Sequence, residues 1–244
     1  LNGRKKLIIP PNSHVSAEIS AGVERTGYLH LSMEQGAEAE ISILQSEAYV
    51  LGGERGDLKV PLKGDREDYK NGFLAGFTDH YRCAGYGTET QPEIYEPFWF
   101  RTFRFVRLEI QTDDQPLVLR NFDYTETGYP LNVQTKVTAS DQRFKKIWEI
   151  SERTLRCCMH ETYEDCPFYE QLQYAMDART QILYTYTLSG DDRLARRCME
   201  DFKRSQRYDG LLNCAAPRYD ASVIPGFSIY YILMLSDHMM YFGD

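Results

Sequence analysis

Residues 161–177 read ETYEDCPFYEQLQYAMD and stand between two segments whose apolar residues recur at helical spacing. Proline disfavours helix in the residue before it, so Pro167 predicts that Asp165 lies in an extended link. Glu170 is then expected at the start of the following helix. Asp177 comes seven residues later, two helical turns along, and would share a face with Glu170. The sequence thus predicts that Asp165, Glu170 and Asp177 line one pocket.

Around this stretch the sequence predicts four helices joined by short or looped links. In the first helix we expect Ser140 at the N-cap and an apolar face, and in the third we expect one apolar side after a cap. The second is expected over residues 171–189 and the fourth over residues 227–242, each followed by a glycine suited to ending a helix. The positions concerned are Phe144, Ile147, Trp148 and Leu155 in the first helix, Asp191, Leu194, Cys198 and Phe202 in the third, and the terminal glycines Gly190 and Gly243. Such helices form hairpins, and because the fourth ends with the chain, we expect the helical fold to continue beyond Asp244.

Before the helices the sequence alternates with the period of β-strands. The clearest run is 104–110, where Val106, Leu108 and Ile110 fall on one face and charged residues on the other. Many short strands with glycine-marked turns predict an antiparallel β-sandwich. The two patterns meet near Pro130, which predicts a β-sandwich domain over residues 1–130 and a helical domain over residues 131–244.

Composition narrows the classes of function. The net charge of −8 argues against a nucleic-acid partner, whose phosphates require a basic surface, and is compatible with a neutral substrate such as a sugar. No apolar run reaches the roughly 20 residues of a membrane span. The six cysteines have neither zinc-ribbon nor redox spacing, and the five histidines are dispersed, so neither a metal nor a cofactor is expected. We expect a soluble protein of the bacterial cytoplasm or periplasm, with homo-oligomers as one possibility.

Clustered carboxylates suggest acid/base chemistry. Their mutual repulsion raises the pKa of one of them, and a glycosidase needs a carboxyl group that stays protonated near neutral pH. Acidic residues are also common at helix starts, where they favour the helix dipole. On spacing alone, the helix-dipole interpretation is preferred.

A family resemblance changes that preference. The pattern Asp165-Cys166-Pro167-x-x-Glu170, followed by Asp177, resembles the signature of the bacterial α-L-rhamnosidases of glycoside hydrolase family 78. Segments 95–106 and 225–244 also resemble the corresponding parts of that family. The resemblance implies an α/α six-hairpin barrel after the sandwich and inverting hydrolysis of terminal α-L-rhamnosyl or closely related residues. It further implies that Glu170 is the general acid and that Asp165 and Asp177 hold the sugar of a rhamnose-containing glycan or glycoside.

The sequence departs from that signature at several positions. Gln171, Gln173, Ala175 and Met176 stand where the signature has arginine, glycine, threonine and glycine, and two tyrosines replace other residues. Tyr169 replaces an arginine, which removes a rigid cationic fork, and Tyr174 replaces a tryptophan but keeps a ring that can stack on a sugar. Tyr219 and Asp220, in the loop before the fourth helix, are further candidates for substrate binding. The general base is expected beyond Asp244.

The sequence also allows an interpretation of three further positions and leaves two alternative functions open. Glu161 and Glu164 are interpreted as solvated loop charges, and His160 as a packed or solvent-facing helix end. One alternative function is a non-catalytic carbohydrate-binding or structural module on the same fold. The other is a barrel that carries out different chemistry, as another glycosidase or a glycoside phosphorylase.

Overall fold

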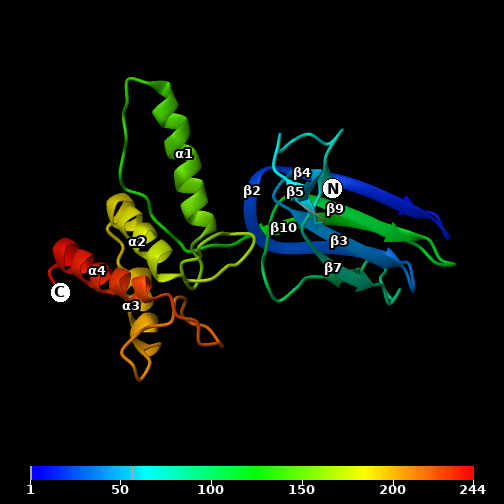
Figure 1. Cartoon of the computed structure of the whole chain (residues 1–244). Coiled ribbons are helices and arrows are strands. Elements are labelled where there is room, and N and C mark those ends of the chain that lie inside the picture. Colours follow the sequence, from blue (N-terminus) through cyan, green and yellow to red (C-terminus); the bar gives the residue numbers. More distant parts are fainter. Residues whose placement is uncertain (1, 56–57) are drawn as a thin grey trace. The chain divides into compact units, whose positions relative to one another are not determined.

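The computed structural model describes residues 2–55 and 58–244, and the chain divides into two compact units, Leu1–Thr127 and Gly128–Asp244 (Figure 1). The first unit is built of strands and the second contains four helices. This order confirms the predicted fold class, an antiparallel β region followed by helices.

The strands of the first unit pair antiparallel throughout the described residues. One sheet has the strand order β1-β10-β2-β9-β3-β7, with β8 also pairing with β2, and a smaller sheet has the order β5-β4-β6. The strands are β1 (Asn2–Ile9), β2 (His14–Gln35), β3 (Glu40–Ser46), β4 (Tyr49–Arg55), β5 (Leu58–Leu62), β6 (Phe73–Leu74), β7 (Phe77–Arg82), β8 (Glu93–Tyr95), β9 (Arg101–Gln111) and β10 (Leu117–Glu126).

Strand β2 is 22 residues long and pairs with two different strands along its length. Its first part pairs with β9, starting from His14 opposite Gln111, and its last part pairs with β10, where Gln35 lies opposite Leu117. A register shift on β2 interrupts the β9 pairing between Ser20 and Arg25, and the ribbon curves strongly (Figure 1). A bulge of this kind bends a strand, so β2 curves while it pairs with both β9 and β10 of the larger sheet.

The main core of the first unit is formed by side chains of the larger sheet. It contains the predicted face of β9 together with residues of β2, β3 and β10, all buried: Leu29, Leu31, Met33, Ile41, Ile43, Val106, Leu108, Ile110, Leu117 and Leu119. The alternation in β9 therefore sorts apolar side chains inward, as the sequence predicts.

The second unit contains α1 (Gln142–Cys157), α2 (Ala175–Ser189), α3 (Arg193–Arg204) and α4 (Pro225–Phe242). Its core gathers residues from every helix and from the link after α1, among them Leu155, Tyr163, Ile182, Leu194, Cys198, Phe202 and Met234. The glycines after α2 and α4, Gly190 and Gly243, adopt the left-handed conformation with φ of 66° and 78°, as expected for helix ends. Among the described residues, no helix is long and apolar enough to cross a membrane.

The start of α1 differs from the prediction. The cap is Asp141 rather than Ser140, because the Asp141 carboxylate accepts a hydrogen bond of 2.9 Å from the backbone N–H of Arg143. The predicted apolar face is only partly used: Leu155 is buried, whereas Phe144 and Ile147 are exposed.

Candidate active site

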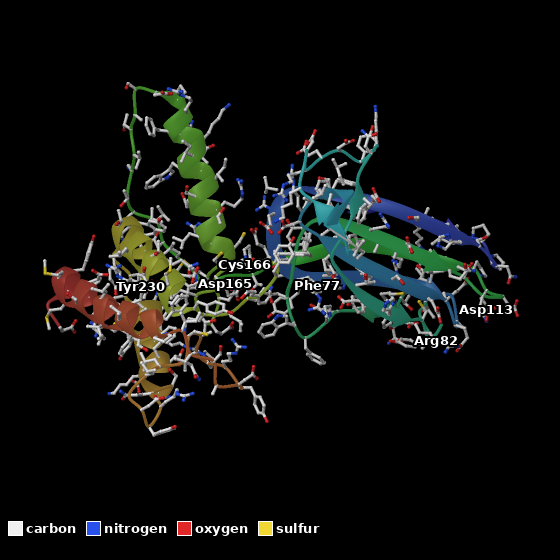
Figure 2. All side chains as sticks on the ribbon, viewed as in Figure 1. Phe77, Arg82, Asp113, Asp165, Cys166 and Tyr230 are labelled. Carbon is white, nitrogen blue, oxygen red and sulfur yellow. The ribbon has the colours of Figure 1, made fainter. Side chains whose placement is uncertain are left out.

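The link between α1 and α2 closes on itself at Asp165. The backbone N–H of Asp165 donates to the carbonyl of Leu172 at 2.9 Å, and the N–H of Leu172 donates to Oδ1 of Asp165 at 3.0 Å. Figure 2 shows Asp165 and Cys166 in this link, beyond the end of α1. The reciprocal bonds pin the two ends of segment 165–172, so the residues between them form a fixed loop.

Glu170 lies at the end of the turn 167–170 and not at the start of α2, which begins at Ala175. The prediction of a helix from residue 171 is wrong because Gln171 has a left-handed backbone, with φ of 52°. Its side-chain Nε2 donates to the Pro167 carbonyl at 2.8 Å, and the N–H of Glu170 donates to Sγ of Cys166 at 3.2 Å. These local bonds stabilise a compact turn in place of a first helical turn.

The loop nevertheless brings the predicted carboxylates together. Asp177 lies in the first turn of α2, half-buried. Burial raises the pKa of the Asp177 carboxyl, and the negative charges of Asp165 and Glu170 raise it further. The three acids therefore share one electrostatic environment, although a loop and not a common helix face places Glu170 there.

The two candidate tyrosines differ in their surroundings. Tyr174, immediately before α2, donates its hydroxyl to the Glu170 carboxylate, and this hydrogen bond is the main reason why the pKa of Tyr174 is raised. Its ring meets Phe227 edge to face, with centroids 6.2 Å apart. Tyr169 is exposed, and its ring contacts the buried Phe168 edge to face, with centroids 5.0 Å apart. Tyr174 is thus tied to Glu170, while Tyr169 presents its ring to solvent.

Gln173 organises the site and was not predicted from the sequence. Its side chain is only 3% exposed; Oε1 accepts from the N–H of Tyr163 at 3.1 Å, and Nε2 donates to the carbonyl of Ala216 at 2.7 Å. The Gln173 backbone carbonyl also accepts from the N–H of Ala216 at 3.1 Å. A signal was available, because this long amide side chain stands where the family signature has glycine.

The loop before α4 carries the last two candidates. Tyr219 is fully exposed, and Asp220 is exposed and pairs with the guanidinium of Arg218 at 3.1 Å. The Arg218 side chain is only 25% exposed, and its positive charge acts on the Tyr174 hydroxyl. The cationic residue of this loop that acts on Tyr174 is therefore Arg218, which the sequence analysis did not single out.

Next to the site lies a buried contact between a histidine and a carboxyl group. Nδ1 of His160 is 3.1 Å from Oε1 of Glu164, and both side chains are about 5% exposed or less. Burial raises the pKa of Glu164, and the neighbouring His160 partly offsets that rise. The interpretation of Glu164 as a solvated charge is wrong, because its carbonyl accepts from Gln181 of α2 at 2.7 Å and its N–H donates to the carbonyl of Cys158 at 2.8 Å.

A cavity of about 540 Å³ opens beside Asp165. Its wall combines Asp165 with side chains of α1 and α2, including Trp148, Leu155, Gln181 and Tyr184. Within residues 2–55 and 58–244, no group of three or more His, Cys, Asp or Glu side chains is arranged to hold a metal ion. The chemistry available here is that of carboxyl groups, hydroxyls and aromatic rings.

Comparison with known proteins places this site in a family. Residues 133–244 match the bacterial α-L-rhamnosidase six-hairpin glycosidase domain. The whole chain superposes on a rhamnosidase of glycoside hydrolase family 78 from Bacillus sp. GL1 with a TM-score of 0.76 and 25% identity, over 97% of this chain. Residues 133–244 are a part of the six-hairpin domain of the bacterial α-L-rhamnosidases, and the chain as a whole is similar in fold to a solved member of that family. The site lies within the residues that match the α-L-rhamnosidase domain.

Two further solved α-L-rhamnosidases share the fold. A rhamnosidase from Klebsiella oxytoca with rhamnose bound gives a TM-score of 0.71 at 19% identity over 99% of this chain. An α-L-rhamnosidase from Dictyoglumus thermophilum gives 0.65 at 17% identity over 97%. The chain spans 23% of the Bacillus protein, 46% of the Klebsiella protein and 27% of the Dictyoglumus protein. No curated protein sequence matches the chain.

Proposed function

We propose that this chain supplies the general acid of a glycoside hydrolase that removes terminal α-L-rhamnosyl, or closely related, residues with inversion. The observation that carries the proposal is the grouping of Asp165, Glu170 and Asp177, in which Asp177 feels the charge of the other two. Asp165, Glu170 and Asp177 are also the acidic positions of the rhamnosidase signature that the sequence resembles. A rhamnosidase structure with rhamnose bound shares the fold and supports the choice of sugar.

In this proposal each group has a distinct task. Glu170, on an exposed turn, is the general acid that protonates the departing glycosidic oxygen. Tyr174 orients the Glu170 carboxyl through its hydroxyl and offers a ring face to the sugar. Asp165 and Asp177 accept hydrogen bonds from sugar hydroxyls, and Tyr169, Tyr219 and Asp220 contact the substrate from the rim.

An inverting enzyme also needs a carboxylate base that activates water, about 6.5–9.5 Å from the acid. We assign the base to no residue of this chain. Glu164, the acidic side chain next to Asp165, is buried against His160 and only 4% exposed, which does not suit a base that activates water.

The test is Glu170→Gln in the full gene product. The amide keeps the shape of the side chain but cannot give up a proton, so rhamnosides with a sugar leaving group should be hydrolysed about 10²–10⁴-fold more slowly. Aryl rhamnosides with acidic leaving groups need little protonation and should be affected much less. Asp165→Asn and Asp177→Asn should instead weaken binding and slow both substrates to a similar degree.

Equal damage to both substrate classes by Glu170→Gln, or none, would remove Glu170 from the acid role. The second candidate function is a carbohydrate-binding module that has lost catalysis. The observation in its favour is the changed signature, with Tyr169 in place of arginine and Tyr174 in place of tryptophan. Tight binding of L-rhamnose without turnover of any rhamnoside would support this alternative.

A further inference from the structure

The loop between α3 and α4 is fastened to the candidate active site. The N–H of Ala175 donates to the carbonyl of Cys214 at 3.0 Å, and Ala216 is bonded to both the backbone and the side chain of Gln173. Within the loop, the N–H of Cys214 donates to the carbonyl of Ser222 at 2.7 Å, which closes residues 214–222 into a ring. The side chains of this ring are thereby held beside residues 173–175.

Arg218 lies within this ring. Its Nη2 is 3.1 Å from Oδ2 of Asp220, and three quarters of its side chain is covered. Ala215, three residues before Arg218, pairs with Tyr174 in an antiparallel bridge. A guanidinium therefore lies in a loop that is bonded directly to the Tyr174 segment, which follows Glu170 and precedes Asp177.

A guanidinium in this place offers chemistry that the carboxylates lack. It carries five N–H donors in a planar fork and no acceptor, so it can donate to two neighbouring oxygens of a ligand at once. Ionised carboxylates can only accept from sugar hydroxyls, so the oxygen lone pairs of the sugar need donors that Asp165 and Asp177 do not supply when ionised. The signature's arginine would supply such donors next to Glu170, but this chain has Tyr169 there.

We propose that Arg218 is a substrate-binding residue that donates hydrogen bonds to the hydroxyl oxygens of the bound sugar, in place of the arginine absent at position 169. The inference rests on the proposed function, because it assumes that the sugar occupies the site of Asp165, Glu170 and Asp177. Asp220 then acts as a positioning residue, because its carboxylate pairs with the guanidinium of Arg218 at 3.1 Å and restricts its orientation.

The experiment measures binding of L-rhamnose to the full gene product by titration calorimetry. Arg218→Gln removes a charged donor and should weaken binding about tenfold or more. The matched control is Arg207→Gln, because Arg207 forms the same kind of pair with Asp209, also at 3.1 Å, in the turn after α3. The control should change the affinity for L-rhamnose by less than about twofold.

A rescue variant tests the replacement itself. Adding Tyr169→Arg to Arg218→Gln should recover most of the lost affinity, because it returns a guanidinium to the vicinity of Glu170. Arg218→Lys keeps the charge without the fork and should fall between wild type and Arg218→Gln. It also serves as the second variant if Arg218→Gln fails to fold, as judged by circular dichroism.

The outcomes separate this inference from the proposed function. If wild type binds L-rhamnose and both Arg218 variants bind it equally well, Arg218 is not a substrate-binding residue and the proposed function stands. Weaker binding that Tyr169→Arg does not restore overturns the equivalence with the signature's arginine. No binding by wild type overturns the proposed function and this inference together.

Discussion

Asp191 ties the segment before α1 to the start of α3. Its carboxylate accepts from the Tyr129 hydroxyl at 3.0 Å, from the backbone N–H of Arg193 at 3.1 Å and from the Arg193 guanidinium at 2.7 Å. The bond to the Arg193 side chain is the main reason why the pKa of Asp191 falls from its ordinary value of 3.8 to about 2. Ionised Asp191 therefore stabilises the folded state.

This predicts how acid affects the second unit. A carboxyl whose pKa is lower when folded adds stability above its unfolded pKa, and the stability is lost as the pH falls from about 4 toward 2. Asp191→Asn should lower the free energy of unfolding by about 1 kcal/mol at neutral pH, since the partner Arg193 is exposed and screened. Between pH 4 and 2 the difference from wild type should shrink, which urea unfolding at each pH would measure. A constant difference down to pH 2 would contradict this explanation.

For single residues, the sequence predicted which side chains are chemically important better than it predicted what surrounds each of them. It predicted that Asp165, Glu170 and Asp177 form a group, and in the structure the charges of Asp165 and Glu170 help to raise the pKa of Asp177. It missed the burial of Glu164, because that depends on Gln181 in another helix as well as on nearby His160. Spacing along the chain carries no information about such a contact between elements.

Among the elements, α2 shows both the strength and the limit of sequence periodicity. Its end at Gly190 was predicted, because a left-handed residue there has a local sequence signal. Its start was predicted four residues too early. Segment 171–174 is not helical because it is hydrogen-bonded to Asp165, Tyr163 and Ala216 instead. Those partners lie outside the helix, and its own sequence does not reveal them.

Two glycines at helix ends should respond in opposite directions to alanine. Gly190 has a φ of 66° and open space around the position of a Cβ, so Gly190→Ala adds conformational strain without a clash and should cost about 1 kcal/mol. Gly226, in the first turn of α4, also has open space but no left-handed backbone, so Gly226→Ala should stabilise by about 0.5–1 kcal/mol. Thermal melting of both variants checks the contrast, and a shift of equal sign would contradict it.

Strand β2 shows what periodicity cannot reveal about a sheet. The inward residues Val15 and Ile19 in its first part and Leu29 and Leu31 in its last part keep the same alternation. Nothing in that pattern shows that the first part pairs with β9 and the last part with β10. The antiparallel β fold was predictable from the sequence, whereas the pairing of one long strand with two different partners was not.

At the scale of the whole molecule, each unit has its own core. We therefore expect two unfolding transitions that respond to different substitutions. Leu108→Ala, in the sandwich core, should cost about 2–5 kcal/mol and shift one transition, and Phe202→Ala, in the helical core, should cost about 3–5 kcal/mol and shift the other. Scanning calorimetry of the two variants makes the comparison, and a joint shift of both transitions in either variant would contradict independent cores.

The curved strand β2 also constrains how the protein is made. The ribosome delivers β2 early, but its partners β9 and β10 lie at residues 101–126 and emerge much later. At a synthesis rate of roughly 5–20 residues per second, the nascent strand waits about 5–20 s without its partners. During that interval its unpaired edges are open to chaperones and to other nascent chains, and the sandwich can close only after translation has passed the last strand.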